Sequence, residues 1–447
     1  MIYYPQKMYY NFRSMICEVH KMQVVSDLLR DIRIPKMVKV RQCFDDSCIA
    51  DEDIASVIQT QLDRPEFTGS THPGMRVAIT CGSRGIHKTA LMAKTIVDFV
   101  KAQGAEPFIV AAMGSHGGAT SEGQRQVLAD YGITPEAMGC DVKCDMDTVE
   151  IGISPELKKH VRIDKNAAAA DGIILLNRIK PHTSFRGKYE SGMMKMMAIG
   201  LGKQHGADDI HGQSPSIMHK LVEDYGRCIM ENCPVLGGIA VIENAYDKPW
   251  KIRSLTPAEI ITEEPKLLKD AYGKIAGLMF DSTDILVVDK IGKNISGDGM
   301  DPNVTGRFCT AYASGGIKAE RVVVLDLTDE THGNAQGIGL ADCTTRRLYD
   351  KLIMHMTYPT GVTNTFLSLF KIPMVMDNDR EAIQLALKCC PDAEDKDSMK
   401  MIRVPDTAHL EYIEISEGLL PAAEKDPRIE ILSQPYDWSF DANGNLF

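Results

Sequence analysis

Apolar and polar residues alternate along the chain in a pattern that predicts strands and helices in turn. The apolar run from Val77 to Thr80 is followed by a glycine-rich turn and then by residues 88–103 (KTALMAKTIVDFVKAQ), whose apolar positions recur with a helical period. A second apolar run, PFIVAAMG, precedes the polar loop SHGGATSEG and a further predicted helix over residues 123–131. Elements in this order are typical of a parallel β-sheet covered by helices.

The pattern continues into the second half of the chain. Another strand is predicted at residues 171–179 (DGIILLNRI), and residues 256–279 are predicted to form a helix that begins with the capping sequence TPAE. The apolar runs in DILVVDKI and in VVVLDL (322–327) are each followed by a polar, glycine-containing loop. We therefore predict an α/β protein with two α/β domains, mostly parallel sheets and an active site in the cleft between the domains.

The predicted organisation has four parts. Residues 1–35 form an N-terminal extension that ends in a short helix, and residues 36–270 form the N-terminal domain. Residues 283–430 form the C-terminal α/β domain, and residues 431–447 form a tail. The boundary lies in the helical connection at roughly 265–283, and 447 residues also exceed the usual size of a single compact core.

The composition narrows the classes of partner. The chain has a formal net charge of −11 and an isoelectric point of about 5.6. A general nucleic-acid or anionic-membrane binder needs a basic face, so we expect no nucleic acid and no membrane as partners. The N-terminus lacks an apolar core of signal-peptide length, and no window of about 20 residues is apolar enough to span a bilayer. We therefore expect a cytoplasmic protein.

The twelve cysteines favour reduced thiols over a metal or redox site. No two of them have the close C-x-x-C spacing of such sites, and Cys140 and Cys144, four residues apart, give only a weak metal signal. Free thiols in a reducing cytosol are the better interpretation for a chain of this size.

Three loops that follow predicted strands carry basic side chains: CGSRG (81–85), GSHGGAT (114–120) and KPHTSFRGK (180–188). Because the carboxyl ends of parallel strands meet at one edge of a sheet, these loops are expected to form a ligand-binding edge. This coincidence is the strongest signal of a site that the residues alone provide.

Each loop supplies one side chain suited to acid–base or anion chemistry. Arg84 can bind a carboxylate through two parallel hydrogen bonds, although a surface ion pair would also explain it. His116 stands in MGSHGG and His182 follows Pro181, and an unperturbed imidazole exchanges protons near neutral pH. Two imidazoles at the ends of neighbouring strands can serve opposite faces of a substrate, as inversion of a stereocentre requires.

An ordered set of motifs joins these loops to a later lysine and histidine. An arginine-bearing turn is followed by G-[ST]-H, P-H, S-G-x-x-K and then a histidine 16 residues beyond that lysine. Over roughly residues 36–330 this order resembles the nickel-pincer lactate racemase family. The resemblance implies an isomerase, a racemase or epimerase of a 2-hydroxy acid that works by proton-coupled hydride transfer to and from its cofactor. That cofactor is a nickel-pincer nucleotide of the nickel pyridinium-3,5-bisthiocarboxylic acid mononucleotide type.

Carried onto this chain, the resemblance gives a role to five residues. Lys195 is the covalent tether of the cofactor, and His211 is the protein ligand of the nickel. His116 and His182 are the acid–base pair, and Arg84 faces the substrate or the cofactor. Two alternatives fit the family spacing less well, His205 as the nickel ligand and Lys188 as the tether.

The chain also departs from the family pattern. Cys81 stands where the family has an aspartate three residues before the arginine, and Met193 and Met194 stand where it has a glycine pair. These two methionines, with Met196 and Met197, are interpreted as packing residues rather than metal ligands. The departures bear on substrate identity more than on reaction class, so a sugar acid or a dicarboxylate is as compatible as lactate.

In the second domain the family has a glutamine and a lysine that contact the substrate, and no counterpart of them is evident from the sequence. The loop IGKNISGDGMDP and the following Gly-Arg pair offer four substrate-binding candidates instead: Lys293, Asn294, Asp298 and Arg307. Ordinary solvated charges in a glycine-rich turn are the alternative interpretation.

Two other functions stay open from the sequence. A zinc-type metal hydrolase would use His116, His182 and His211 as ligands, although no catalytic carboxylate is evident beside them. A non-catalytic carrier of nickel or of the nucleotide would need only Lys195 and His211. The partners implied for the racemase are a small hydroxy-acid substrate and the cofactor-assembly proteins, and an oligomer is compatible with the sequence.

Overall fold

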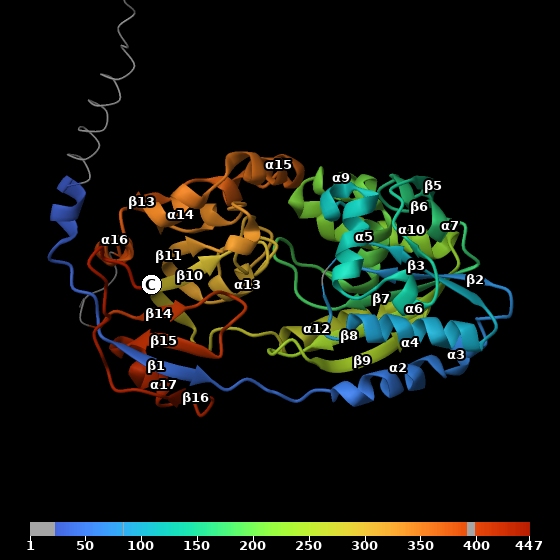
Figure 1. Ribbon diagram of the computed structural model, residues 1–447, viewed down its shortest axis with the longest axis horizontal. Coiled ribbons are helices and arrows are strands. Elements are labelled where there is room, and N and C mark those ends of the chain that lie inside the picture. Colours follow the sequence, from blue (N-terminus) through green and yellow to red (C-terminus); the bar gives the residue numbers. More distant parts are fainter. Residues whose placement is uncertain (1–22, 84, 391–397) are drawn as a thin grey trace, which may run out of the picture.

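The computed structural model of the chain describes residues 23–83, 85–390 and 398–447, which fold into two lobes side by side (Figure 1). Each lobe is a β-sheet with helices packed on it. The N-terminal lobe lies on the right of Figure 1 and the C-terminal lobe on the left. Within the described ranges, no helix is both long and apolar enough to cross a membrane.

The sheet of the N-terminal lobe has six strands. They are β2 (Arg76–Cys81), β3 (Glu106–Ala111), β4 (Val142–Lys143), β7 (Gly172–Arg178), β8 (Val235–Glu243) and β9 (Pro249–Leu255). Their order across the sheet is β4-β3-β2-β7-β8-β9, and all neighbours are parallel except β8 and β9. Since both faces are covered, strands such as β7 (GIILLNR) are apolar along most of their length.

Helices bury both faces of this sheet. On one face lie α2 (Ile54–Leu62) and α4 (Thr89–Ala102), which pack against strand residues such as Ile174. On the other face lies α10 (Met218–Asn232), which shares a core with Leu175. The alternation of Ile174 and Leu175 between the two cores follows from the two-residue period of a strand.

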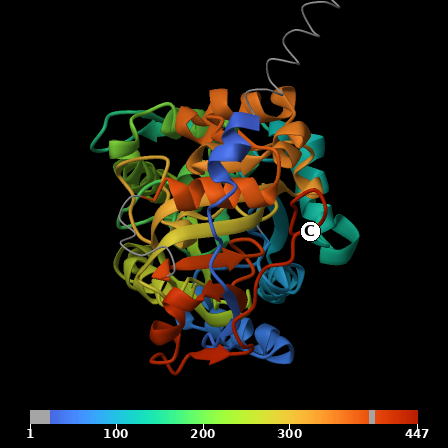
Figure 2. The ribbon, with the colours of Figure 1, turned by 90° about the vertical axis from the view of Figure 1, so that its left-hand side faces the viewer.

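The sheet of the C-terminal lobe has eight strands. They are β1 (Met37–Gln42), β10 (Ser282–Ile291), β11 (Lys318–Leu327), β12 (Cys343–Thr345), β13 (Met374–Met376), β14 (Met401–Val404), β15 (Tyr412–Ser416) and β16 (Ile429–Ile431). In the order β13-β12-β11-β10-β14-β15-β1-β16, the first five are parallel and the rest antiparallel. In Figure 2, which faces this lobe, α16 (Asp379–Lys388) lies in front of the sheet. The predicted fold class, α/β with mostly parallel sheets, is confirmed.

The remaining elements are short. They include the separate hairpin β5 (Thr148–Ile153) and β6 (His160–Asp164), and the helices α3 (Pro65–Thr68), α5 (Ser121–Asp130), α6 (Pro135–Met138), α7 (Lys165–Ala168), α11 (Pro257–Thr262), α12 (Glu264–Tyr272), α13 (Pro302–Thr305), α14 (Arg346–Lys351), α15 (Met354–Asn364) and α17 (Leu420–Ala423). The predicted helix over 256–279 is thus two helices, because Pro265 lacks an N–H and cannot continue α11. The TPAE sequence does form a capping box at the start of α11.

Strand β1 places residues 37–42 differently from the predicted domain organisation. The N-terminal domain was expected to begin at residue 36, but β1 pairs with β15 and β16 in the sheet of the C-terminal lobe. Its partner is remote in sequence, with Met37 opposite Ser416, so no local pattern identifies the pairing. The predicted tail follows β16, and its Tyr436 returns to bridge Met37.

Candidate functional site

The carboxyl ends of three adjacent strands carry the three predicted loops. β3, β2 and β7 are neighbours in the sheet, so the expected meeting of their loops at one edge is confirmed. His116 follows β3 and His182 follows β7. Arg84, predicted to face the substrate or cofactor from the loop after β2, lies outside the described residues.

A bent helical segment, here called the arm (residues 192–211), carries two further predicted residues. It consists of α8 (Gly192–Lys195), the π-helix η3 (Met196–Leu201) and α9 (Lys203–His211). π-Helices are rare and concentrate at functional sites. If the arm were a straight α-helix, the sixteen residues from the predicted tether to the predicted ligand would span about 24 Å.

Lys203 bends the arm. Its φ of 54° is in the left-handed region, which costs an L-residue other than glycine about 1–2 kcal/mol. The turn lets α9 pack back on η3, where a Cβ on Gly206 would stand 2.8 Å from the carbonyl oxygen of Ala198. The end of the arm therefore returns toward its start.

Lys195, His182 and His211 form one electrostatic group. Burial lowers the pKa of His211 to about 4, and the Lys195 ammonium acts in the same direction while Asp208 opposes it. Burial also lowers the pKa of His182 well below its usual range, with Lys195 and then His211 adding to the effect. Both imidazoles are therefore neutral at pH 7, and the three predicted residues lie near enough for the Lys195 charge to act on both rings.

The Nδ1 atom of His211 is buried and has no hydrogen-bond partner in the part of the chain that the structure describes. Leaving a buried polar atom unpaired costs about 1–3 kcal/mol. A neutral imidazole nitrogen with its lone pair exposed to a site is also a common metal ligand. The carbonyl oxygen of His211 accepts a bond of 3.3 Å from Thr365 Oγ1, which ties the end of the arm to the C-terminal lobe.

The ring of His182 is held in one tautomer. The backbone N–H of Ser184 donates to His182 Nδ1 over 3.0 Å, so the proton of the neutral ring is on Nε2. The Phe185 ring lies against the imidazole with centroids 4.3 Å apart. His182 thus presents an N–H donor at Nε2, and the tautomer would have to change before that atom could accept a proton.

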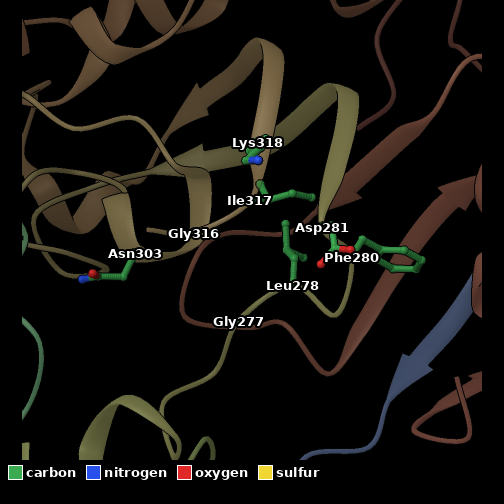
Figure 3. Close-up of a pocket in the computed structure, with 8 residues that line it drawn as sticks. All are labelled: Gly277, Leu278, Phe280, Asp281, Asn303, Gly316, Ile317 and Lys318. Atoms are coloured by element: carbon green, nitrogen blue, oxygen red, sulfur yellow. The ribbon is translucent and has the colours of Figure 1, made fainter. Parts of the chain in front are cut away.

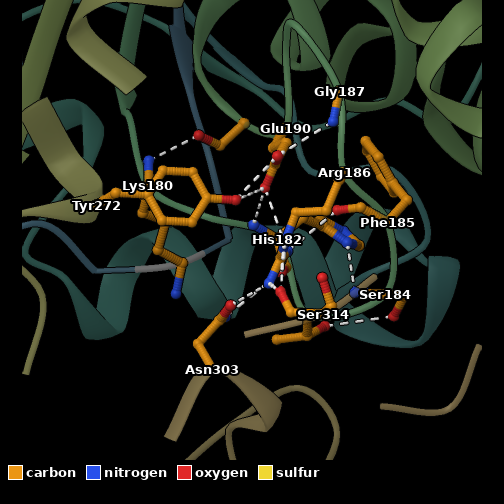
Figure 4. A network of polar contacts seen from close by, with 12 residues as sticks. Lys180, His182, Ser184, Phe185, Arg186, Gly187, Glu190, Tyr272, Asn303 and Ser314 are labelled. Atoms are coloured by element: carbon orange, nitrogen blue, oxygen red, sulfur yellow. Dashed lines mark hydrogen bonds and ion pairs between the residues drawn. The ribbon is translucent and has the colours of Figure 1, made fainter. Parts of the chain in front are cut away.

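A buried carboxylate organises the loop around His182 (Figure 4). Glu190 accepts hydrogen bonds from the backbone N–H groups of His182 (2.9 Å) and Gly187 (3.1 Å) and from the Tyr272 hydroxyl. It also pairs with Arg186 at 3.3 Å. Since Tyr272 ends α12, this network links the loop to the connection between the lobes.

Arg186 joins the same loop to the C-terminal lobe (Figure 4). Its guanidinium donates to His182 O (2.6 Å), to Asn303 Oδ1 (2.6 Å) and to Ser314 O (2.9 Å). Asn303 Nδ2 in turn donates to His182 O over 3.3 Å. His182 therefore lies between the two lobes, as predicted for a site in the cleft.

Two of the predicted substrate residues share a polar network that reaches this loop. Lys293 Nζ donates to Gly297 O and to Gln336 Oε1, both at 2.8 Å. Gln336 Nε2 donates to Asp298 Oδ1 (3.1 Å), and Ser184 Oγ donates to Asp298 Oδ2 (3.4 Å). Lys293 and Asp298 thus lie on the side of the C-terminal lobe that faces the loop after β7.

The other two predicted substrate residues are placed differently. Asn294 Oδ1 accepts a bond of 2.7 Å from Thr328 Oγ1, just past the carboxyl end of β11. Arg307 donates to Asp342 Oδ2 and to the carbonyl of Glu320, both at 2.9 Å. Glu320 is near the start of β11, at the opposite edge of the sheet, so the structure does not bring Arg307 to the other three.

His116 is exposed on a loop that is fastened to the arm. Gln124 Nε2, on α5, donates to His116 O (3.2 Å) and to Gly114 O (2.9 Å). The N–H of Gly114 donates to Gly200 O over 3.2 Å. The backbone of this loop therefore rests on η3, the part of the arm that follows Lys195.

A buried acid holds the start of the arm. Glu264 accepts from the backbone N–H groups of Met193 (3.0 Å) and Met194 (3.4 Å), and burial raises its pKa to about 8. Gly192 has a φ of 76°, and a Cβ there would stand 2.5 Å from the Glu264 carboxyl group. Gly192, Met193 and Met194 directly precede Lys195, so their packing against Glu264 fixes the position of the predicted tether.

The methionines of the arm are buried, which confirms their interpretation as packing residues: Met193, Met194, Met196 and Met197. The alternative tether Lys188 is exposed and pairs with Glu223 at 3.5 Å, and the alternative ligand His205 is exposed on α9. Among the described residues, no three His, Cys, Asp or Glu side chains are grouped to hold a metal ion.

Several residues of the site were not anticipated from the sequence. Ser184, Arg186 and Glu190 stand in or next to the KPHTSFRGK loop, where the density of polar groups was a usable signal. Gln336 and Lys203 had no such signal, because their roles depend on contacts remote in sequence.

An open pocket of about 500 Å³ lies beside this region, between the connection to β10 and the loop before β11 (Figure 3). Its lining includes Asn303, Asp281 and Lys318. It shares only Asn303 with the network around His182, so it is a neighbouring hollow rather than the site itself.

Comparison with known proteins gives a family match and a structural likeness. Residues 82–293 match a family model described as a domain of unknown function, DUF362. No curated protein matches the chain. Among solved structures, the chain is similar to the lactate racemase apoprotein from Thermoanaerobacterium thermosaccharolyticum, with 13% identity, a TM-score of 0.49, and coverage of 83% of this chain and 99% of that one.

The raised pKa of Glu264 predicts a specific pH dependence of stability. Between the usual carboxyl pKa of 4.5 and the raised pKa of about 8, the folded state binds the proton that the unfolded state has lost, so stability falls as pH rises through this window. In denaturant titrations from pH 5 to 8, Glu264→Gln should remove about 3–4 kcal/mol of this decline.

The matched control is Glu424→Gln, a change at an exposed position. It should keep the pH slope of the unmodified chain. Equal slopes for Glu264→Gln and the unmodified chain would show that Glu264 is ionised in the folded protein at neutral pH.

Proposed function

We propose that this protein is a racemase or epimerase of a 2-hydroxy acid that uses a nickel-pincer nucleotide. The observation that carries the proposal is the convergence of Lys195 with two neutral imidazoles, those of His211 and His182. The order of motifs, which resembles the lactate racemase family, supports the same reading.

The residues fit such a cofactor. His211 Nδ1 is buried, neutral and unpaired among the described residues, as a nickel ligand should be before it meets the metal. The described residues offer no three-ligand metal site, so the other donors to nickel would come from the nucleotide itself. Lys195 is the residue we assign to the covalent link. When bound, the nucleotide supplies the centre for reversible hydride transfer at the substrate carbon.

The two acid–base histidines have unequal roles in this proposal. His182 donates a hydrogen bond from Nε2 to the substrate oxygen, because Nδ1 is engaged by the Ser184 N–H. His116, exposed on its loop, is assigned as the first acceptor of the hydroxyl proton. The two groups come from the carboxyl ends of two strands of one sheet, which holds them in a fixed relation to the substrate.

We assign the substrate carboxylate to Arg84 and Lys293, and a further polar group to Asp298. Among the described residues, Gln336 and Ser184 donate hydrogen bonds to the Asp298 carboxylate, which has further lone pairs for a substrate hydroxyl. Arg307 is not part of this assignment, because it is bound at the far edge of the sheet.

The proposal predicts a covalent modification. When the chain is produced with the cofactor-assembly proteins, it should contain nickel and carry an adduct on Lys195. Intact-mass and peptide-mass spectrometry measure this directly, and Lys195→Arg should abolish the adduct. Lys188→Arg, at the exposed alternative, should retain it. Racemase activity from a chain with no adduct would contradict the proposal.

The proposal also separates catalysis from cofactor retention. His116→Asn should lower turnover by about 10²–10⁴-fold while the adduct and nickel content stay unchanged, because His116 moves a proton and does not hold the metal. Turnover is measured as the loss of chirality of a set of 2-hydroxy acids, each with and without deuterium at the α carbon. His160→Asn, at an exposed histidine paired with Glu150, is the control and should change neither quantity. Full turnover in His116→Asn would favour a carrier of nickel or nucleotide over a catalyst.

A further inference from the structure

Lys203 is a fully buried lysine whose ammonium makes two hydrogen bonds and one ion pair. Its ammonium lies 3.1 Å from Asp164 Oδ2, and neither side chain is exposed. It also donates to the carbonyl oxygen of Ala111 and, over 3.3 Å, to Gln124 Oε1. The contact with Asp164 is an ion pair without a hydrogen bond, and it compensates the charge of the buried ammonium.

The partners of Lys203 belong to three different elements. Ala111 is the last residue of β3, Gln124 is on α5 and Asp164 ends β6. The other oxygen of Asp164 accepts from the N–H groups of Asn166 and Ala167 and caps α7. Lys203 therefore ties the strand that leads to His116 to the hairpin beneath the arm.

The amide of Gln124 transmits this contact to the His116 loop. Lysine has no acceptor, so the ammonium of Lys203 fixes the amide with Oε1 toward itself. The NH₂ group then points the other way and donates to Gly114 O and His116 O. The side chain of Gln124 is completely buried, so water does not reach the amide group that makes these bonds.

The backbone of Lys203 affects the position of His211. Its left-handed conformation separates η3 from α9 and turns His211 back toward Lys195. One residue thus determines the course of the arm through its main chain and the position of the His116 loop through its side chain.

We propose that Lys203 is a positioning residue that sets His116 and His211 relative to each other. The roles of the two histidines rest on the proposed function, but the geometric claim does not. A lysine that only stabilises the fold would also be buried. The two roles differ in which histidine ring signals change when Gln124 or Lys203 is substituted.

The test uses the full-length chain purified without nickel and labelled with ¹⁵N at histidine. Gln124→Glu keeps the size of the side chain and an acceptor for Lys203 but removes both donors to the loop, so the ring signals of His116 should shift while those of His211 stay. Lys203→Met should shift both. The exposed histidines His72, His160 and His409 are internal controls and should not move.

The same variants are compared in turnover of the cofactor-loaded enzyme. Gln124→Glu should lower kcat by about tenfold to a hundredfold with a smaller change in KM, because a displacement of about 1 Å of a catalytic group costs on the order of 10² in rate. If Lys203→Met does not fold, Lys203→Met with Asp164→Asn removes the pair without leaving a buried charge and takes its place.

Three outcomes are informative. Selective shifts of His116 and His211 support the positioning role even if no nickel is ever found, which would count against the proposed function alone. A fall in melting temperature with no selective shift, or with shifts at all histidines, overturns the positioning role. Adduct formation on Lys195 in the unmodified chain tests the proposed function separately.

Discussion

The arm turns back on itself at Lys203, and the candidate site depends on that turn. Without it, the sixteen residues between Lys195 and His211 would carry the two groups about 24 Å apart. The left-handed backbone is unfavourable by itself, and the buried contacts of the lysine to β3, α5 and Asp164 hold it in place. Glycines on the arm then let α9 and η3 approach closely.

The turn also places the imidazoles where they stay uncharged. The imidazoles of His182 and His211 lie in a buried region near the Lys195 ammonium. Burial and the nearby positive charge each disfavour protonation of the rings. Neutral rings are what the proposed metal binding at His211 and the proposed hydrogen-bond donation at His182 require. The C-terminal lobe contributes by closing on this region through Arg186, Asn303 and Thr365, so the site is completed by contacts between the lobes.

Sequence patterns predicted the features that depend on neighbouring residues. The alternation of strands and helices gave the fold class, and the loops after β3 and β7 were placed at the correct edge. The motif spacing singled out Lys195 and His211, which the structure brings together. Features that depend on distant partners were not predictable. The pairing of β1 with β15, the position of Arg307 at the far edge and the bend at Lys203 all require contacts that no local pattern encodes.

X-ray absorption at the nickel edge tests the central claim most directly. The chain produced with the assembly proteins should show nickel bound by sulfur together with one imidazole nitrogen, and His211→Ala should lose that nitrogen while it keeps the sulfur. Nickel surrounded only by nitrogen and oxygen, or an unchanged spectrum in His211→Ala, would contradict the account.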